Sequence, residues 1–206
     1  MTERSAREAI LRAVRAARAA HTPPPDVGTI ARSFPRPAGS LAARFAAAAQ
    51  AAGARVVEVT ADCFAPMITE VAPQAKRVLS TISGIPGTVD IPEDPRLLAD
   101  LDLLLCEAVF GVAENGAVWL PASRVGSRAA PFLATSVAVL LDRDAIVADL
   151  HDAYARLQLG AESFGVLVAG PSKTADIEQS LVIGAHGPKQ LTVLLVDGTH
   201  LPSPHR

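Results

Sequence analysis

The sequence has few aromatic residues, few charges and almost no cysteine. Aromatic residues make up 4% of the 206 residues, so the core has to consist mainly of alanine, valine, leucine and isoleucine. Charged residues make up 19%, below the quarter that is usual in soluble domains. The net charge is −2 and no long basic block is present, which argues against a nucleic-acid-binding surface.

The two cysteines, Cys63 and Cys106, lie far apart in the sequence and form no C-x-x-C pair. The sequence therefore predicts neither a zinc site nor an iron–sulfur cluster held by this chain. His186 is a lone histidine between glycines, which favours a turn residue over a metal ligand, and we predict no metal site. No run has the length of a transmembrane helix, and the absence of an apolar signal segment predicts a cytoplasmic protein.

Four nearly continuous apolar runs predict strands that are buried on both faces. They are "LDLLLCEAV", "SVAVLL", "FGVLVA" and "LTVLLV". Such strands are typical of a mostly parallel sheet, and a helix is predicted over residues 144–157. The predicted fold class is α/β, with a mostly parallel sheet covered by helices on both faces. Ligands of such sheets bind outside the carboxyl ends of the strands.

The first part of the chain differs from the rest. "SARE" at residues 5–8 is a capping box that predicts a helix, and "TPPPD" at residues 22–26 ends it, because successive prolines cannot continue a helix. We therefore expect an N-terminal helix and Pro-rich arm over residues 1–39 and an α/β domain over residues 40–206.

The segment "GVAENGAVWL" at residues 111–120 is the first candidate site. Asn115-Gly116 is a strong turn signal, because both residue types tolerate positive φ. The turn places Glu114 at the end of a strand, where a partly buried carboxylate can act as a general base. The alternative is a hairpin turn with a solvated glutamate.

The segment "GPSKTADIEQSLVIGAHGPKQ" at residues 170–190 is the second. Gly170 ends a predicted strand, and Ser172 or Thr174 is expected to cap a helix that carries Asp176 and Glu178 in its first turns. A glycine turn before a capped helix presents N–H groups to an anion, and Lys173 adds charge. The alternative is that the two acids only stabilise the helix end.

Both segments resemble signatures of the LUD-domain (DUF162) family, specifically its lactate utilisation protein C type. The resemblance covers roughly Ser40 to Gly198, and the second segment matches without gaps. It implies a fold similar to sugar-phosphate isomerases and CoA-transferases (NagB/RpiA-like). It also implies a subunit of an iron–sulfur system that oxidises L-lactate to pyruvate. The clusters are then expected only in iron–sulfur partner subunits.

The resemblance also suggests roles for individual residues. Glu114 is the candidate base, and Asp176 and Glu178 are further catalytic candidates. A small carboxylate or other anionic ligand would be held by Asn115, Gly116, Arg124, Arg128, Gly170, Ser172, Lys173 and Thr174. The two arginines, in "ASRVGSRAA", would form a clamp for a carboxylate.

Three questions remain open from the sequence. Whether the chain is catalytic is undecided, because a non-catalytic scaffold of the same system fits the same residues. An acyl-CoA transferase-like or sugar-phosphate enzyme is a further alternative, since "ENG" resembles the glutamate loop of CoA-transferases, although Ala113 stands where those enzymes commonly have serine. A homo-oligomer is also compatible with the sequence.

Overall fold

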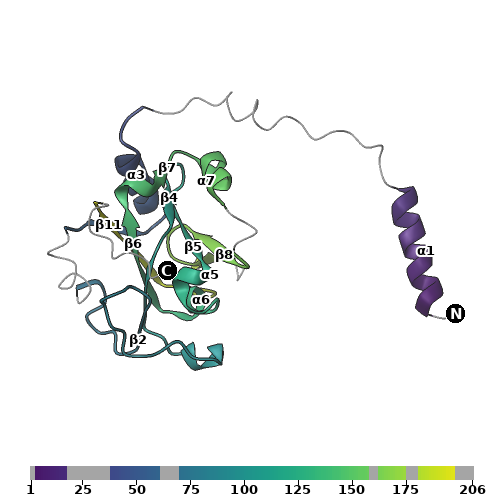
Figure 1. Cartoon of the computed structure of the whole chain (residues 1–206), viewed down its shortest axis with the longest axis horizontal. Coiled ribbons are helices and arrows are strands. Elements are labelled where there is room, and N and C mark those ends of the chain that lie inside the picture. The colour runs from purple at the N-terminus through teal and green to yellow at the C-terminus, as the bar shows by residue number, and fades with distance from the viewer. Residues whose placement is uncertain (1–2, 18–37, 61–69, 158–161, 175–180, 198–206) are drawn as a thin grey trace. The chain divides into compact units, whose positions relative to one another are not determined.

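The computed structural model describes residues 3–17, 38–60, 70–157, 162–174 and 181–197 (Figure 1). The chain divides into two compact units, residues 1–36 and residues 37–206. The first unit contains helix α1 (Glu3–Ala16), on which Ile10 and Val14 are exposed. None of the helices in the described ranges combines the length and the apolar character that crossing a bilayer requires.

The second unit is built around a five-stranded parallel sheet. Its strands, in spatial order, are β1 (Arg55–Glu58), β11 (Gln190–Val196), β6 (Ser136–Asp142), β3 (Leu103–Glu107) and β2 (Val78–Ser80). Each neighbouring pair is parallel. The central strands are apolar runs buried on both faces, and all five residues of β3 are buried. The predicted α/β class with a mostly parallel sheet is confirmed.

One face of this sheet packs against helix α3 (Leu41–Ala51), the short helices α5 (Ala122–Val125) and α6 (Ala130–Leu133), and a second sheet. Ser40 is the N-cap of α3, and its side chain accepts a hydrogen bond from Ala43 N. Phe45 of α3 is fully buried in this layer. Side chains of β3, β6 and β11 on the other face form a second apolar cluster with Val71 and Ile82.

The second sheet has four strands in the order β7 (Ile146–Val147), β4 (Phe110–Val112), β5 (Ala117–Pro121) and β8 (Gly165–Val168). Strands β4 and β5 form an antiparallel hairpin, and β8 pairs antiparallel with β5. The run "FGVLVA" was expected in the parallel sheet, and this is wrong. Strand β8 is only half-buried, because it lies at the edge of the second sheet.

The helix predicted over residues 144–157 is only partly present. A 3-10 turn, η3 (Arg143–Ala145), leads into β7, and helix α7 (Leu150–Arg156) begins after Asp149. The Asp149 side chain accepts a hydrogen bond from Asp152 N and fixes this start. Ile146 and Val147 pair with β4 instead of forming a helical turn. Strand pairing that the local sequence does not reveal overrides helix propensity here.

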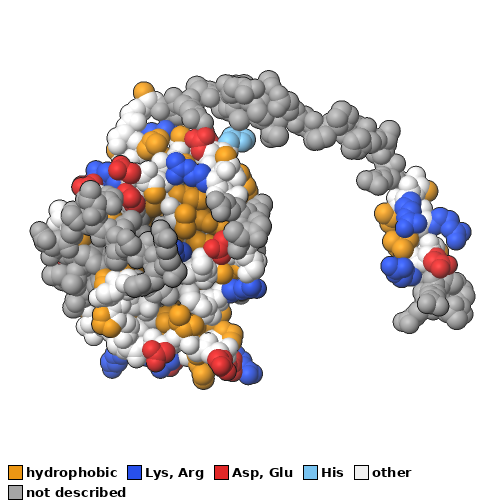
Figure 2. Space-filling view, viewed as in Figure 1, with side chains coloured by type: hydrophobic (Ala, Val, Ile, Leu, Met, Phe, Trp, Pro, Cys, Tyr) orange, Lys and Arg blue, Asp and Glu red, His pale blue; other side chains and the backbone are white. Residues whose placement is uncertain are grey.

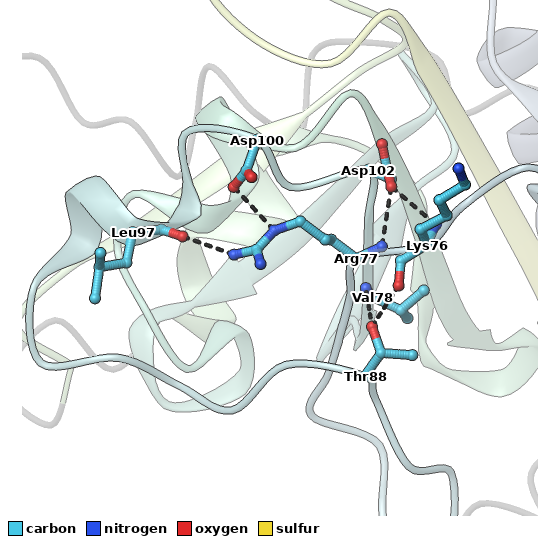
Figure 3. A network of polar contacts seen from close by, with 7 residues as sticks. All are labelled: Lys76, Arg77, Val78, Thr88, Leu97, Asp100 and Asp102. Carbon is cyan, nitrogen blue, oxygen red and sulfur yellow. Dashed lines mark hydrogen bonds and ion pairs between the residues drawn. The ribbon is translucent and has the colours of Figure 1, made fainter.

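A polar network holds the amino ends of β2 and β3 together (Figure 3). Asp102 accepts hydrogen bonds from Lys76 N at 2.8 Å and from Arg77 N at 2.9 Å, and these bonds lower the pKa of its carboxyl group. The Arg77 guanidinium donates to Leu97 O of the 3-10 helix η2 (Pro95–Leu98) and lies 2.9 Å from Asp100. The network therefore fixes the position of the edge strand β2 in the sheet.

The outer side of β2 is also covered. Val78 N donates to Thr88 Oγ1 (Figure 3). Val78 O accepts from Thr88 N and Val89 N. Backbone groups that would otherwise be open at the sheet edge are satisfied within the chain.

Candidate functional site

The two sequence signatures meet on one helix. In the antiparallel pairing of β5 with β8, Val118 lies opposite Val168. Gly116 comes two residues before Val118, and Gly170 comes two residues after Val168. Both glycines have positive φ, 69° and 70°. A Cβ added at Gly116 would lie 2.3 Å from Ala49 N, and one at Gly170 would lie 2.2 Å from the carbonyl oxygen of Ala52. Both turns therefore press on the end of α3, and only glycine fits there.

The side chains of the first turn are used for capping. Glu114 is exposed, and its Oε2 accepts a hydrogen bond from Leu150 N at 3.0 Å, at the start of α7. Asn115 Oδ1 accepts from Ala117 N at 3.0 Å and stabilises the turn. The partial burial expected for Glu114 as a general base is absent. Its hydrogen bond to Leu150 N instead indicates that Glu114 helps to cap the amino end of α7.

The second turn continues into a small ribbon. Strand β9 (Lys173–Thr174) pairs antiparallel with β10 (Val182–Ile183). Ser172 is followed by a strand, so the expectation that it caps a helix is wrong. Its backbone N–H donates to Pro188 O at 2.8 Å and is already used. Asp176 and Glu178, with the helix predicted around them, lie outside the described residues.

Lys173 is engaged within the protein as well. Its Nζ donates to Ala52 O at 2.7 Å, just beyond the last residue of α3. A cation at this end of a helix compensates the unpaired carbonyl groups and the negative end of the dipole. In this position the Lys173 ammonium group stabilises the carboxyl end of α3 and is not directed at an external anion.

The second turn lies at the amino end of the parallel sheet. Ala52 lies three residues before the start of β1 and Pro188 two residues before the start of β11, so the partners of Lys173 and Ser172 both precede parallel strands. Residues 170–174 therefore lie at the amino edge of the sheet, and the expected position of this part of the segment at the carboxyl edge is wrong. A carboxyl-edge site has to be sought elsewhere in the domain.

An ion pair occupies the carboxyl end of β3. Glu107, the last residue of this strand, is 9% exposed, and apart from Thr192 it is the one buried polar residue in the described part of the chain. Its Oε2 pairs with Nη1 of Arg124 on α5. Burial raises the pKa of the Glu107 carboxyl group, and the Arg124 charge opposes this rise. Burying a carboxylate is costly without such a partner, and perturbed groups of this kind concentrate at functional sites.

Thr81, directly after β2, holds Arg124 in place. Its hydroxyl donates to Arg124 O at 2.6 Å, and its backbone N–H donates to Leu105 O at 3.0 Å. The Arg124 side chain as a whole retains 31% of its exposure, so it is accessible in part from solvent. We call Thr81, Glu107 and Arg124 the carboxyl-end cluster. Of these three residues, only Arg124 is a candidate from the sequence. The charge of Glu107 at the end of an apolar strand is a weak signal, because such a residue usually reaches solvent.

Arg128 does not join this cluster. Its Nη2 donates to Ser163 Oγ at 2.7 Å, and its guanidinium lies 5.9 Å from the centre of the Phe164 ring. The two arginines predicted as one clamp thus have different partners. Arg124 pairs with Glu107 at the end of β3, and Arg128 binds Ser163, which precedes β8. The part of the clamp hypothesis that remains is a single arginine.

The described residues contain no group of three or more His, Cys, Asp or Glu side chains that could hold a metal ion. Cys106 is fully buried, and burial raises the pKa of its thiol to about 12. A thiol of this kind is a poor metal ligand and a poor nucleophile.

On the face shown in Figure 2, acidic and basic side chains are interspersed among apolar ones.

Comparison with known proteins places these features in a family. The sequence model of the LUD domain matches residues 76–196. Lactate utilization protein C of Bacillus pumilus is 32% identical over 94 residues, which are 43% of this chain and 39% of that protein. Lactate utilization protein C 1 of Bacillus mycoides is 30% identical over 117 residues, 54% of this chain and 50% of that protein. The chain thus spans half or less of the length of these curated relatives.

A solved structure shares the fold. The crystal structure of a DUF162 family protein from Deinococcus radiodurans superposes with a TM-score of 0.58 at 19% sequence identity, and the alignment covers 78% of this chain and 99% of that chain. The region matched by the LUD domain includes both signature turns and all three residues of the carboxyl-end cluster.

Proposed function

This chain belongs to the LUD domain family, and from that membership we propose that it is a subunit of an iron–sulfur system that oxidises L-lactate to pyruvate. The similarity to proteins named lactate utilization protein C supports this proposal. In it, the chain binds a small carboxylate at the carboxyl end of the parallel sheet. In this proposal the iron–sulfur clusters are held by partner subunits, since the chain has only two cysteines, which form no C-x-x-C pair.

The ion pair between Glu107 and Arg124 is the observation on which the binding role depends. A guanidinium presents its N–H groups in a planar fork that matches a carboxylate. The Arg124 side chain is partly exposed although it pairs with Glu107, and its backbone is held in position by Thr81. Lactate and pyruvate both carry the carboxylate that such a group recognises. The role assigned to this chain is to hold that carboxylate and orient the ligand.

The binding role can be tested by thermal shift on the full-length protein. L-lactate and pyruvate should raise the melting temperature of the wild type and of Arg128→Gln, but not that of Arg124→Gln. At a ligand concentration of ~100 Kd, binding adds about 2.7 kcal/mol to the free energy of unfolding. Coenzyme A and a sugar phosphate belong in the same screen, because stabilisation by either one alone would favour the transferase-like or isomerase-like alternative. Equal stabilisation of Arg124→Gln and the wild type would remove Arg124 from the site.

A non-catalytic scaffold is the second candidate. It is favoured by the partners of Glu114, Ser172 and Lys173, which are all groups of this chain. The exposed Ile10 and Val14 of α1 offer a docking surface for a partner subunit. Deletion of residues 1–39 should then abolish co-purification of the iron–sulfur subunits while the domain remains folded. Retained partners in the truncated protein would exclude docking through this arm.

A further inference from the structure

We propose that Glu107 is an internal competitor for Arg124, occupying the guanidinium until the carboxylate of a ligand displaces it. This inference rests on the proposed role of Arg124 in carboxylate binding. The contact between Glu107 and Arg124 is of the same chemical kind as the contact that a bound lactate or pyruvate would make. The ligand-free protein therefore already contains a bound carboxylate, supplied by its own strand β3.

The backbones on both sides of the pair are fixed. Glu107 lies opposite Leu140 in the parallel pairing of β3 with β6. Arg124 is held through its carbonyl group by Thr81, and the next residue, Val125, is fully buried. An exchange of partners at Arg124 therefore requires only side-chain rotation. The Arg124 side chain is 31% exposed and the Glu107 side chain 11%, so the arginine is the more accessible partner of the pair.

Displacement leaves Glu107 without its cation in a buried position. An unpaired buried carboxylate is strongly unfavourable, whereas the protonated carboxyl group is tolerated. The exchange is balanced when the Glu107 carboxylate takes one proton from solvent and the ligand remains ionised on Arg124. The cluster is neutral before the exchange, with Glu107 and Arg124 charged, and neutral after it, with Arg124 and the ligand charged.

Few other groups influence this proton. Among the described residues, the charge that acts on Glu107 is Arg124 of α5. The neighbouring Cys106 on β3 remains a neutral thiol, because burial raises its pKa to about 12. Glu107 is therefore the group that takes up the proton, and ligand affinity has to fall as the pH rises above the pKa that Glu107 has in the ligand-free protein.

Isothermal titration calorimetry of the full-length protein with L-lactate and pyruvate tests this inference. Titrations in buffers of different ionisation enthalpy give the number of protons taken up per ligand. At a pH between the pKa values that Glu107 has in the free protein and in the complex, the wild type should take up about one proton, and its affinity should fall about tenfold per pH unit. Glu107→Gln should bind more tightly, without proton uptake and without this pH dependence. Arg124→Gln should lose binding.

Two further variants complete the experiment. Glu58→Gln removes a carboxylate at the end of β1, which is 74% exposed and 3.4 Å from Arg143, and should behave as the wild type. Glu107→Asp keeps the charge with a shorter reach and should bind more tightly than the wild type while still taking up a proton. If Glu107→Gln does not fold, the comparison of Glu107→Asp with the wild type tests the inference in its place.

The outcomes separate the two proposals. Ligand binding without proton uptake, with equal affinity in wild type and both Glu107 variants, overturns the competitor role and leaves the proposed function intact. Weaker binding in both Glu107 variants also overturns it, because Glu107 would then help to hold the ligand. If no variant binds either anion, carboxylate binding at Arg124 is wrong, and the competitor role is wrong with it.

Discussion

Substituting alanine for Gly170 tests whether the second signature turn serves packing. The residue has φ +70°, and its new Cβ would lie 2.2 Å from Ala52 O and 2.9 Å from the Ala52 carbonyl carbon. A left-handed conformation costs a non-glycine residue roughly 1–2 kcal/mol. Overpacking against backbone that has to shift adds about 1–3 kcal/mol. We expect Gly170→Ala to lower the free energy of unfolding by about 2–5 kcal/mol.

Gly84→Ala is the matched control. Gly84 also has positive φ, +77°, but a Cβ at this position meets nothing within 4 Å. It should cost only the conformational part, roughly 1–2 kcal/mol. Urea denaturation of the two variants beside the wild type measures the difference. Unchanged m-values would show that the unfolded state is the same in all three proteins.

Equal destabilisation by the two substitutions would refute the packing argument, because contact with α3 would then contribute nothing. A second readout is ligand binding. Since Gly170 lies at the amino end of the sheet and Arg124 at the carboxyl end, Gly170→Ala should leave lactate affinity unchanged in every molecule that remains folded. A loss of lactate affinity in folded Gly170→Ala would indicate that the turn at Gly170 contributes to the binding site.

Three further substitutions have predictable effects. Because burial raises the pKa of Glu107 above 4.5, the wild type should lose stability relative to Glu107→Gln as the pH rises from that value through the folded-state pKa; parallel pH profiles in urea unfolding would contradict this. Because backbone hydrogen bonds lower the pKa of Asp102 below 3.8, the wild type should lose stability as the pH falls through the folded-state value, and Asp102→Asn should show a smaller acid effect by circular dichroism. Lys173→Met removes the hydrogen bond to Ala52 O and should cost about 0.5–1.5 kcal/mol in urea unfolding, whereas no loss would show that water replaces the ammonium group.

Much of the fold follows from apolar runs in the sequence. Strands β3, β6 and β11 are recognisable because leucine and valine occupy consecutive positions on both faces. The same rule fails for β8, whose local sequence looks similar although it lies at the edge of a second sheet. It fails again at Ile146 and Val147, where pairing with β4 decides the conformation. Partners distant in sequence determine these strands.

The candidate site was harder to predict for a related reason. Asn115, Gly116 and Gly170 were recognised as turn residues, and the structure has turns there. The packing of the two glycines on the end of α3 has no local signal, because Gly116 lies 67 residues from Ala49 (116 − 49) and Gly170 lies 118 residues from Ala52 (170 − 52) in the sequence. Glu107 was overlooked because one charged residue at a strand end usually reaches solvent. Its burial depends on α5 covering the end of β3, and only the tertiary structure shows that.

The position of α3 affects how this domain can be dissected. The match to the LUD domain begins at residue 76, yet Phe45 and Ala49 of α3 are fully buried in the core. A fragment that began at the family boundary would lose this helix, and with it the surface that supports both signature turns. Removal of a single buried phenylalanine side chain already costs about 3–5 kcal/mol. Recombinant fragments intended for binding studies should therefore start no later than Ser40, because the sequence boundary of the family lies inside the folding unit.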